Sequence, residues 1–168
     1  LRREGLECGD SVPLGIMLET AASLPLIEDW ARRVDFFALG TNDLTASVLG
    51  LDRDDPVGST PADALHPGLL RLIHGAVQAA HRAGRPVSVC GELAALPAGA
   101  LVLAAMGVDT CSVPVDRLEP IRRVLQRPEP ARLLGLAQQL LQLPTANLVH
   151  ELFRPWTEGD STIETTET

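Results

Sequence analysis

The chain contains no lysine and no tyrosine, so its 14 basic side chains other than histidine are all arginines. Without lysine the chain cannot form a Schiff base with a carbonyl substrate, anchor pyridoxal phosphate or build the lysine of a phosphate-binding P-loop. Any acid–base chemistry is therefore left to Asp, Glu, His or Cys side chains.

Cysteine is scarce as well: Cys8, Cys90 and Cys111 form neither a CxxC motif nor a set that can pair completely. This favours a reducing, cytoplasmic location over a secreted disulfide scaffold. The sequence has no apolar run of the roughly 18 residues that a membrane-spanning helix needs. It also shows no basic leader followed by an apolar segment. We therefore expect a soluble globular protein with no membrane partner.

Positive charge is in short supply too, since the formal net charge is −8. Nucleic acids and anionic membranes attract basic surfaces, so we expect neither as a partner. Part of the negative charge lies near the end of the sequence, which is rich in Thr and Glu and has little to bury. We predict a disordered acidic tail over residues 156–168.

Short apolar segments alternate with longer amphipathic ones along most of the chain. Strands are predicted over residues 14–19, 35–39, 86–90 and 110–113, and the first has the short apolar pattern of a strand buried on both faces. Helices are predicted over residues 24–34, 44–51, 66–83, 98–106, 118–126 and 131–143, with a long acidic loop over 52–63. This alternation predicts an α/β fold with a parallel sheet.

The four predicted strand–helix units occupy residues 1–127, which corresponds to half of a (β/α)₈ TIM barrel. A whole barrel needs about 250 residues. Half a barrel leaves two unpaired parallel edges, so an upstream half or a second chain would have to close it. A small open α/β sandwich that is complete on its own fits the pattern equally well. Residues 128–155 are predicted to form a helical extension.

Polar residues follow the predicted strands, and parallel α/β folds gather their functional groups at the carboxyl ends of strands. The first strand ends in Glu19. A carboxylate directly after a buried strand requires solvent, an ion pair or a metal ion. Glu19 could also simply neighbour a helix N-terminus, where the helix dipole favours negative charge.

The second strand runs into Gly40, Thr41, Asn42 and Asp43. Glycine lets the backbone approach a ligand, and the three polar residues offer a hydroxyl, an amide, a carboxylate and backbone N–H groups. This set suits a phosphate bound together with a hard cation such as Mg²⁺. A helix start also explains Thr, Asn and Asp, which are good N-caps, although three in succession exceed what capping needs.

Cys90 closes the third strand and is followed by Gly91 and Glu92. It is either a small buried apolar residue or, at the mouth of a barrel, a proton donor or nucleophile. Arg53 lies among aspartates in the predicted loop, where it could clamp a phosphate or carboxylate, or only pair with its neighbours. The histidines show no metal-binding spacing.

Taken in order, several segments resemble the phosphoenolpyruvate-utilising enzymes. The matching stretches are GIMLET (15–20), VDFFALGTNDLTASVLGLDR (34–53), HPGLLRLI (66–73), GRPVSVCGELA (84–94) and GVDTCSV (107–113). The chain is most similar to Enzyme I of the bacterial sugar phosphotransferase system, because the dikinases of the family carry a longer insertion between the second and third of these strands. The resemblance favours half a barrel over the open sandwich.

The resemblance also implies roles for single residues. Glu19 and Asp43 would hold Mg²⁺. The Asn42 side chain, the backbone N–H of Asp43 and Arg53 would contact the phosphate of phosphoenolpyruvate. Cys90 would protonate the enolate carbon as pyruvate forms. The implied substrate-binding set is Gly40, Thr41, Asn42, Asp43 and Arg53.

The activity implied is phosphoryl transfer from phosphoenolpyruvate to a protein histidine, serving sugar transport through a phosphocarrier protein. A homodimer is expected, and the 168-residue chain should be inactive alone. The chain departs from the family at Ala21, where Pro is usual, at Ala46, where Gln is usual, and after Glu92, where Leu93-Ala94-Ala95-Leu96 replaces Met-Ala-Gly-Asp. Two other functions stay open: a non-catalytic binding or dimerisation module, and a Mg²⁺-dependent lyase or aldolase.

Overall fold

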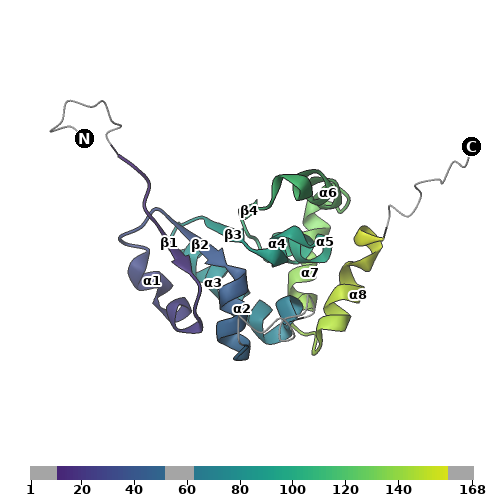
Figure 1. Ribbon diagram of the computed structural model, residues 1–168, viewed down its shortest axis with the longest axis horizontal. Coiled ribbons are helices and arrows are strands. Elements are labelled where there is room, and N and C mark those ends of the chain that lie inside the picture. The colour runs from purple at the N-terminus through teal and green to yellow at the C-terminus, as the bar shows by residue number, and fades with distance from the viewer. Residues whose placement is uncertain (1–10, 52–62, 159–168) are drawn as a thin grey trace, which may run out of the picture.

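The computed structural model describes residues 11–51 and 63–158, and its strands form one parallel sheet (Figure 1). The strands are β1 (Gly15–Leu18), β2 (Phe36–Gly40), β3 (Val87–Cys90) and β4 (Thr110–Ser112). They pair in the order β1-β2-β3-β4, so each strand lies beside the one that precedes it in sequence. All four predicted strands are confirmed at nearly the same boundaries.

Helices connect the strands and continue after the last one. They are the 3₁₀ helix η2 (Ala21–Leu26), α1 (Ile27–Trp30), α2 (Thr41–Leu49), the 3₁₀ helix η3 (Asp63–Leu65), α3 (Pro67–Arg82), α4 (Glu92–Ala95), α5 (Pro97–Ala105), α6 (Val115–Leu125), α7 (Pro130–Leu140) and α8 (Ala146–Thr157). Within the described part of the chain, none of these helices is long and apolar enough to cross a bilayer.

Proline accounts for two helices that the sequence pattern did not predict correctly. The single helix predicted over 24–34 is instead η2, which contains Pro25, followed by the short α1. Proline lacks the N–H that an α-helix interior requires. Pro97 likewise holds Leu96 in an extended conformation, with ψ 132°, and so separates α4 from α5.

The predicted start of the acidic tail, residue 156, is too early in the sequence, because α8 continues to Thr157. Its N-cap is Thr145, whose hydroxyl accepts a hydrogen bond from the Leu148 N–H at 3.4 Å. Val149 and Phe153 are fully buried, so packing fixes this helix in place. The rest of the predicted tail and most of the predicted loop lie outside the described residues.

Within the described part of the chain, helices cover one face of the sheet, which corrects the prediction that the first strand is buried on both faces. Phe37, Leu39 and Val89 point to the covered face and are fully buried. Met17 and Phe36 point to the other face and are 47% and 36% exposed. The strands therefore alternate between a packed side and an open side, as in a sheet that has one solvent-accessible face.

The C-terminal helices share a core with the sheet. The central helix is α5, whose Leu101 and Leu103 have no exposed surface, and α6, α7 and α8 all pack against it. Leu133 of α7 and Phe153 of α8 belong to the same apolar cluster as the strands. The helical extension thus packs against the strand–helix units, while the division at residue 127 stays a sequence-based prediction.

Two arginine side chains donate hydrogen bonds to backbone carbonyls at the C-terminal ends of the helices in this extension. Arg71 of α3 donates from Nε to the carbonyl of Leu141, at the end of α7, over 2.9 Å. Arg127 donates from Nη1 to the carbonyl of Trp156, in the last turn of α8, over 2.6 Å. The guanidinium group matches the negative end of the helix dipole and leaves fewer carbonyls unsatisfied.

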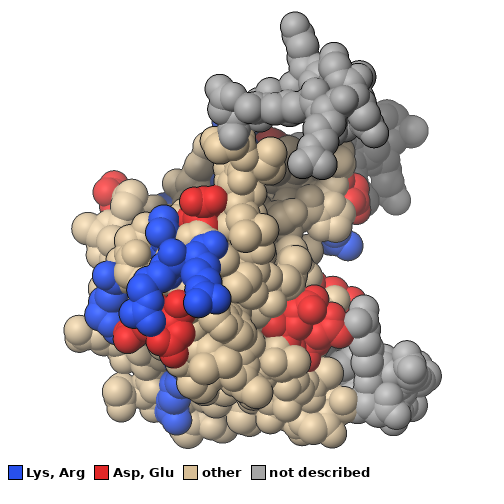
Figure 2. Space-filling view, turned by 90° about the vertical axis from the view of Figure 1, so that its left-hand side faces the viewer, with Lys and Arg blue, Asp and Glu red and all other residues tan. Residues whose placement is uncertain are grey.

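On the side of the molecule that carries α1, arginines and carboxylates lie interleaved (Figure 2). Ion pairs join Arg32 to Asp29 at 3.1 Å and Arg82 to Glu28 at 2.9 Å, and all four side chains are more than half exposed. Exposed pairs of this kind contribute about 1 kcal/mol or less.

Candidate functional site

The carboxyl ends of β1, β2 and β3 lie side by side. Leu18, the last residue of β1, pairs with Leu39, and Gly40, the last residue of β2, pairs with Cys90 at the end of β3. Because the strands are parallel, the polar residues that follow them emerge at the same edge of the sheet. The structure therefore brings together the motifs that the sequence singled out after these strands.

Glu19 folds over the end of β2. A Cβ atom built on Gly40 would lie 3.0 Å from Glu19 Cγ, 3.2 Å from Glu19 Oε1 and 3.2 Å from the Met17 sulfur. A side chain at position 40 would thus crowd this carboxylate and the thioether beside it. Glu19 is exposed at the strand end, so its carboxylate is available to a ligand.

The first turn of α2 begins at Thr41, directly after β2. The N-cap position is Gly40, and no side chain caps the helix there. Gly40 is thus the N-cap of α2, and Thr41, Asn42 and Asp43 form its first turn, so the helix start that these residues also suggested is present. The N–H groups of a first turn have no carbonyl partner within the helix, which makes this turn a suitable place for an anion.

Two side chains of this turn instead bind the segment after β3. Thr41 is 1% exposed, and its hydroxyl donates to the carbonyl oxygen of Cys90 over 2.9 Å. The Asn42 Oδ1 atom accepts a hydrogen bond from the Glu92 N–H over 2.9 Å. Because Oδ1 is the acceptor, the Asn42 amide group is the end of this side chain that can donate to a ligand.

The Cys90 thiol lies on the open side of the sheet. Its Sγ atom is 3.8 Å from the Met17 sulfur and 3.7 Å from the carbonyl oxygen of Leu39. Cys90 is only half-buried, so a substrate at the strand ends can reach it. Burial raises the pKa of the thiol of Cys111, the other described cysteine, which suits a structural residue.

Comparison with known proteins decides the family. A family model described as the phosphoenolpyruvate-binding domain of phosphoenolpyruvate-utilising enzymes matches residues 1–129. The chain belongs to this family. The resemblance seen in the motifs is therefore confirmed.

Relatives of the domain include two kinds of transferase. It is 40% identical over 141 residues to a multiphosphoryl transfer protein of Xanthomonas campestris pv. campestris, covering 84% of this chain and 17% of the relative. It is 41% identical over 148 residues to a multiphosphoryl transfer protein of Rhodobacter capsulatus, covering 88% and 18%. It is 32% identical over 157 residues to a phosphoenolpyruvate-protein phosphotransferase of Listeria monocytogenes, covering 94% and 27%. The chain thus spans less than a third of each of these relatives.

The carboxylates of this phosphoenolpyruvate-binding domain have the chemistry that Mg²⁺ requires. Among the described residues, no group of three or more His, Cys, Asp or Glu side chains could hold a metal ion. Mg²⁺ is usually bound by only one or two carboxylates, with substrate phosphate oxygens and water completing the shell. Glu19 and Asp43 follow neighbouring strands and supply two such oxygen donors, so they fit the ion without a complete protein cage.

Two histidines of the domain make structural contacts. His66 caps α3, since its Nδ1 atom accepts from the Gly68 N–H over 3.1 Å. His81 lies 2.8 Å from Asp109, beside the first residue of β3. Burial acts to raise the pKa of Asp109, but hydrogen bonds from Val87 and His81 and the charge of His81 outweigh it and lower that pKa. The contact between His81 and Asp109 therefore lies at the amino end of β3, opposite the edge of the sheet that carries the predicted site.

Two features of the site were not predicted. The sequence offered Met17 only as an apolar strand residue, although two-residue alternation already places it on the face of Glu19. Thr41 was assigned to substrate binding, whereas its hydroxyl is buried against Cys90. Arg53 and Cys8 lie outside the described residues, so Arg53 stays a prediction from sequence.

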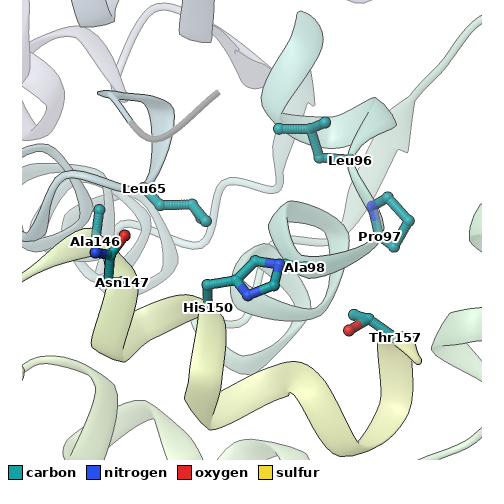
Figure 3. Close-up of a pocket in the computed structure, with 8 residues that line it drawn as sticks. All are labelled: Leu65, Leu96, Pro97, Ala98, Ala146, Asn147, His150 and Thr157. Atoms are coloured by element: carbon teal, nitrogen blue, oxygen red, sulfur yellow. The ribbon is translucent and has the colours of Figure 1, made fainter. Parts of the chain in front are cut away.

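A separate cavity of about 280 Å³ lies between α5 and α8, and Figure 3 shows the ring of His150 projecting into it. The apolar part of the lining comes from Leu65, Leu96, Pro97, Ala98 and Ala146, and the polar part from Asn147, His150 and Thr157. None of the predicted site residues within the described ranges is among them. The candidate site therefore lies at the strand ends and not in this cavity.

Proposed function

We propose that this domain is the C-terminal half of the (β/α)₈ barrel of a phosphoenolpyruvate–protein phosphotransferase. The full-length protein would transfer the phosphoryl group of phosphoenolpyruvate to one of its histidines and release pyruvate. The observation that carries the proposal is the meeting of Glu19, the first turn of α2 and the Cys90 thiol at one edge of the sheet. The family match to phosphoenolpyruvate-utilising enzymes supports the same substrate.

The open face of the sheet supports a missing half of the barrel. Met17 and Phe36 are substantially exposed on that face, and the edge strand β1 has no partner beyond β2 among the described strands. In a closed barrel this face would point inward, toward side chains from the remaining strands. Four further strand–helix units from the full-length protein would cover it, and they would supply further phosphate-binding groups.

The first turn of α2 would bind the phosphate of the substrate. The positive end of the helix dipole at this first turn favours a dianion there. The Asn42 side chain would donate to the phosphate from its NH₂ group, since its Oδ1 atom already accepts from the Glu92 N–H. Arg53 would add a bidentate contact to the same phosphate.

Glu19 and Asp43 would hold Mg²⁺ beside this phosphate. When bound, the ion supplies positive charge where negative charge builds up on the phosphate and on the enolate oxygen. The close approach of Glu19 to Gly40 keeps this carboxylate next to the α2 turn. The absence of a side chain at position 40 is therefore part of the proposed site.

Cys90 would complete the reaction as the general acid. The bond between phosphorus and the enol oxygen breaks, the phosphoryl group moves to a histidine nitrogen, and the enolate of pyruvate remains. The Cys90 thiol gives its proton to C3 of the enolate, which becomes the methyl group of pyruvate. The thiolate then regains a proton from water. Formation of the stable keto product pulls the transfer forward.

The partners of the full-length protein follow from the same proposal. A phosphocarrier protein would accept the phosphoryl group in sugar transport, and two copies of the protein would form a homodimer. The free thiols of Cys90 and Cys111 support a reducing, cytoplasmic compartment. The phosphocarrier partner and the homodimer are what the family resemblance implies, and both concern the full-length protein.

Phosphoenolpyruvate carrying a labelled phosphate tests the proposed transfer. With Mg²⁺ present, the full-length protein should gain a label that is lost in acid and kept in base, which is the behaviour of phosphohistidine, and should release one pyruvate for each label. A chelator should prevent both. Pyruvate released with free phosphate and no labelled protein would contradict the transfer to histidine. If the protein formed neither labelled phosphohistidine nor pyruvate, this result would contradict the proposed function as a whole.

A further inference from the structure

The α2 turn and the segment after β3 are joined by two hydrogen bonds. One runs from the Thr41 hydroxyl to the Cys90 carbonyl, and the other from the Glu92 N–H to the Asn42 side chain, each over 2.9 Å. They connect residues about 50 positions apart in the sequence and lie on either side of Gly91. The backbone on both sides of Gly91 is therefore fixed to the turn that is proposed to bind phosphate.

Gly91 allows this contact. Its φ of +113° lies in the region that residues with a side chain rarely adopt. A Cβ atom here would collide with the Thr41 hydroxyl and would lie 2.7 Å from Asn42 Oδ1. The segment thus packs directly on the two side chains that hold it, and this packing determines where the preceding residue, Cys90, can lie.

We infer that Thr41 is a positioning residue for Cys90, acting through the Cys90 carbonyl and not on the substrate. The inference rests on the proposed function, in which Cys90 protonates the enolate. Thr41 is 1% exposed and its hydroxyl hydrogen is used within the protein, so its side chain has no free donor for a ligand. Its own carbonyl accepts from the Thr45 hydroxyl over 2.6 Å, a bond within α2 that does not reach the segment after β3.

Asn42 extends the same connection to the substrate. Its oxygen holds the Glu92 N–H, and its amide group is the part left for the phosphate. Phosphate binding and the placement of the general acid therefore share one side chain. Thr41 and Asn42 together keep the distance between the phosphate and the thiol fixed, which is what proton transfer to a carbon three bonds from phosphorus requires.

Thr41→Val in the full-length protein tests the inference, since valine keeps the shape and removes the donor. We expect kcat for pyruvate release to fall about ten- to a hundredfold, with KM for phosphoenolpyruvate changed by less than about twofold. Exchange of the pyruvate methyl protons with D₂O, with Mg²⁺ and inorganic phosphate present, should slow by a similar factor. Thr41→Ser should restore both rates to within about threefold of the wild type.

The matched control is Thr45→Val, which removes another buried threonine hydroxyl from the same helix but leaves the Cys90 carbonyl bonded. It should change kcat and the exchange rate by less than about twofold. Thr41→Ala is measured alongside Thr41→Val, so that a folding defect in one variant does not decide the result. Thr41 variants with wild-type kcat and exchange, or with a raised KM and unchanged kcat, would overturn the inference. If the wild type itself releases no pyruvate, the proposed function fails first.

Discussion

Cys90→Ala should lower the rate of pyruvate release by the full-length protein about 10²- to 10⁴-fold, which is the usual contribution of a general acid. The thiol lies at the carboxyl end of β3 and is half-exposed on the open face. Binding of phosphoenolpyruvate should change by less than about threefold, because the phosphate-binding turn keeps its contacts. Single-turnover kinetics with a separate titration of substrate measure the two quantities.

Cys111→Ala is the control for the loss of a thiol. Cys111 lies in β4, and burial raises the pKa of its thiol, so it should remain protonated and inert. Its replacement should leave the rate of pyruvate release within about twofold of the wild type. A Cys90→Ala variant that matches this control would remove Cys90 from the mechanism, and pyruvate formation would then need another proton source.

Gly99→Ala should destabilise the domain by about 3 kcal/mol, the upper end of the usual range for overpacking. A Cβ atom at Gly99 would collide with the carbonyl oxygen of Leu93 and lie 2.7 Å from Leu93 Cδ1. The obstacle is backbone of the neighbouring helix α4, which a side-chain rotation cannot relieve. Thermal and denaturant unfolding measure the loss, and wild-type stability of Gly99→Ala would contradict this close packing of α4 against α5.

Gly75→Ala is the matched control, because it adds the same methyl group to a helix interior. No atom lies within 4 Å of a Cβ atom built on Gly75, which is an exposed position in α3. Alanine there should stabilise the protein by about 0.5–1 kcal/mol, since it restricts the unfolded chain and favours the helix. The two substitutions should therefore change stability in opposite directions.

The strands were predictable because each is a short apolar segment that ends in glycine or polar residues, and this signal does not depend on the rest of the molecule. The burial of their second face was not predictable in the same way. Apolar residues such as Met17 and Phe36 fit equally well in a sheet covered on both faces and in one that leaves a face open. What covers a face depends on other elements, which a strand's own residues do not encode.

The site was predicted in its position but not in its internal contacts. Apolar periodicity and the glycine and polar residues after each strand placed Glu19, Asn42 and Cys90 at neighbouring strand ends, and the register of β2 with β3 agrees. The bonds from Thr41 to Cys90 and from Glu92 to Asn42 join segments that are far apart in sequence. Such pairings depend on the exact approach of two turns, and here that approach requires the positive φ of Gly91.

The most direct test of the proposed site is a calorimetric titration of the full-length protein with phosphoenolpyruvate, with and without Mg²⁺. We predict that Mg²⁺ tightens binding by about tenfold or more in the wild type, as expected for two ligands that share a site. Glu19→Gln should reduce this effect to less than about twofold, whereas Glu28→Gln, on the exposed helix α1, should keep it. A Glu19→Gln variant with the full Mg²⁺ effect would contradict a phosphoenolpyruvate and magnesium site at the strand ends.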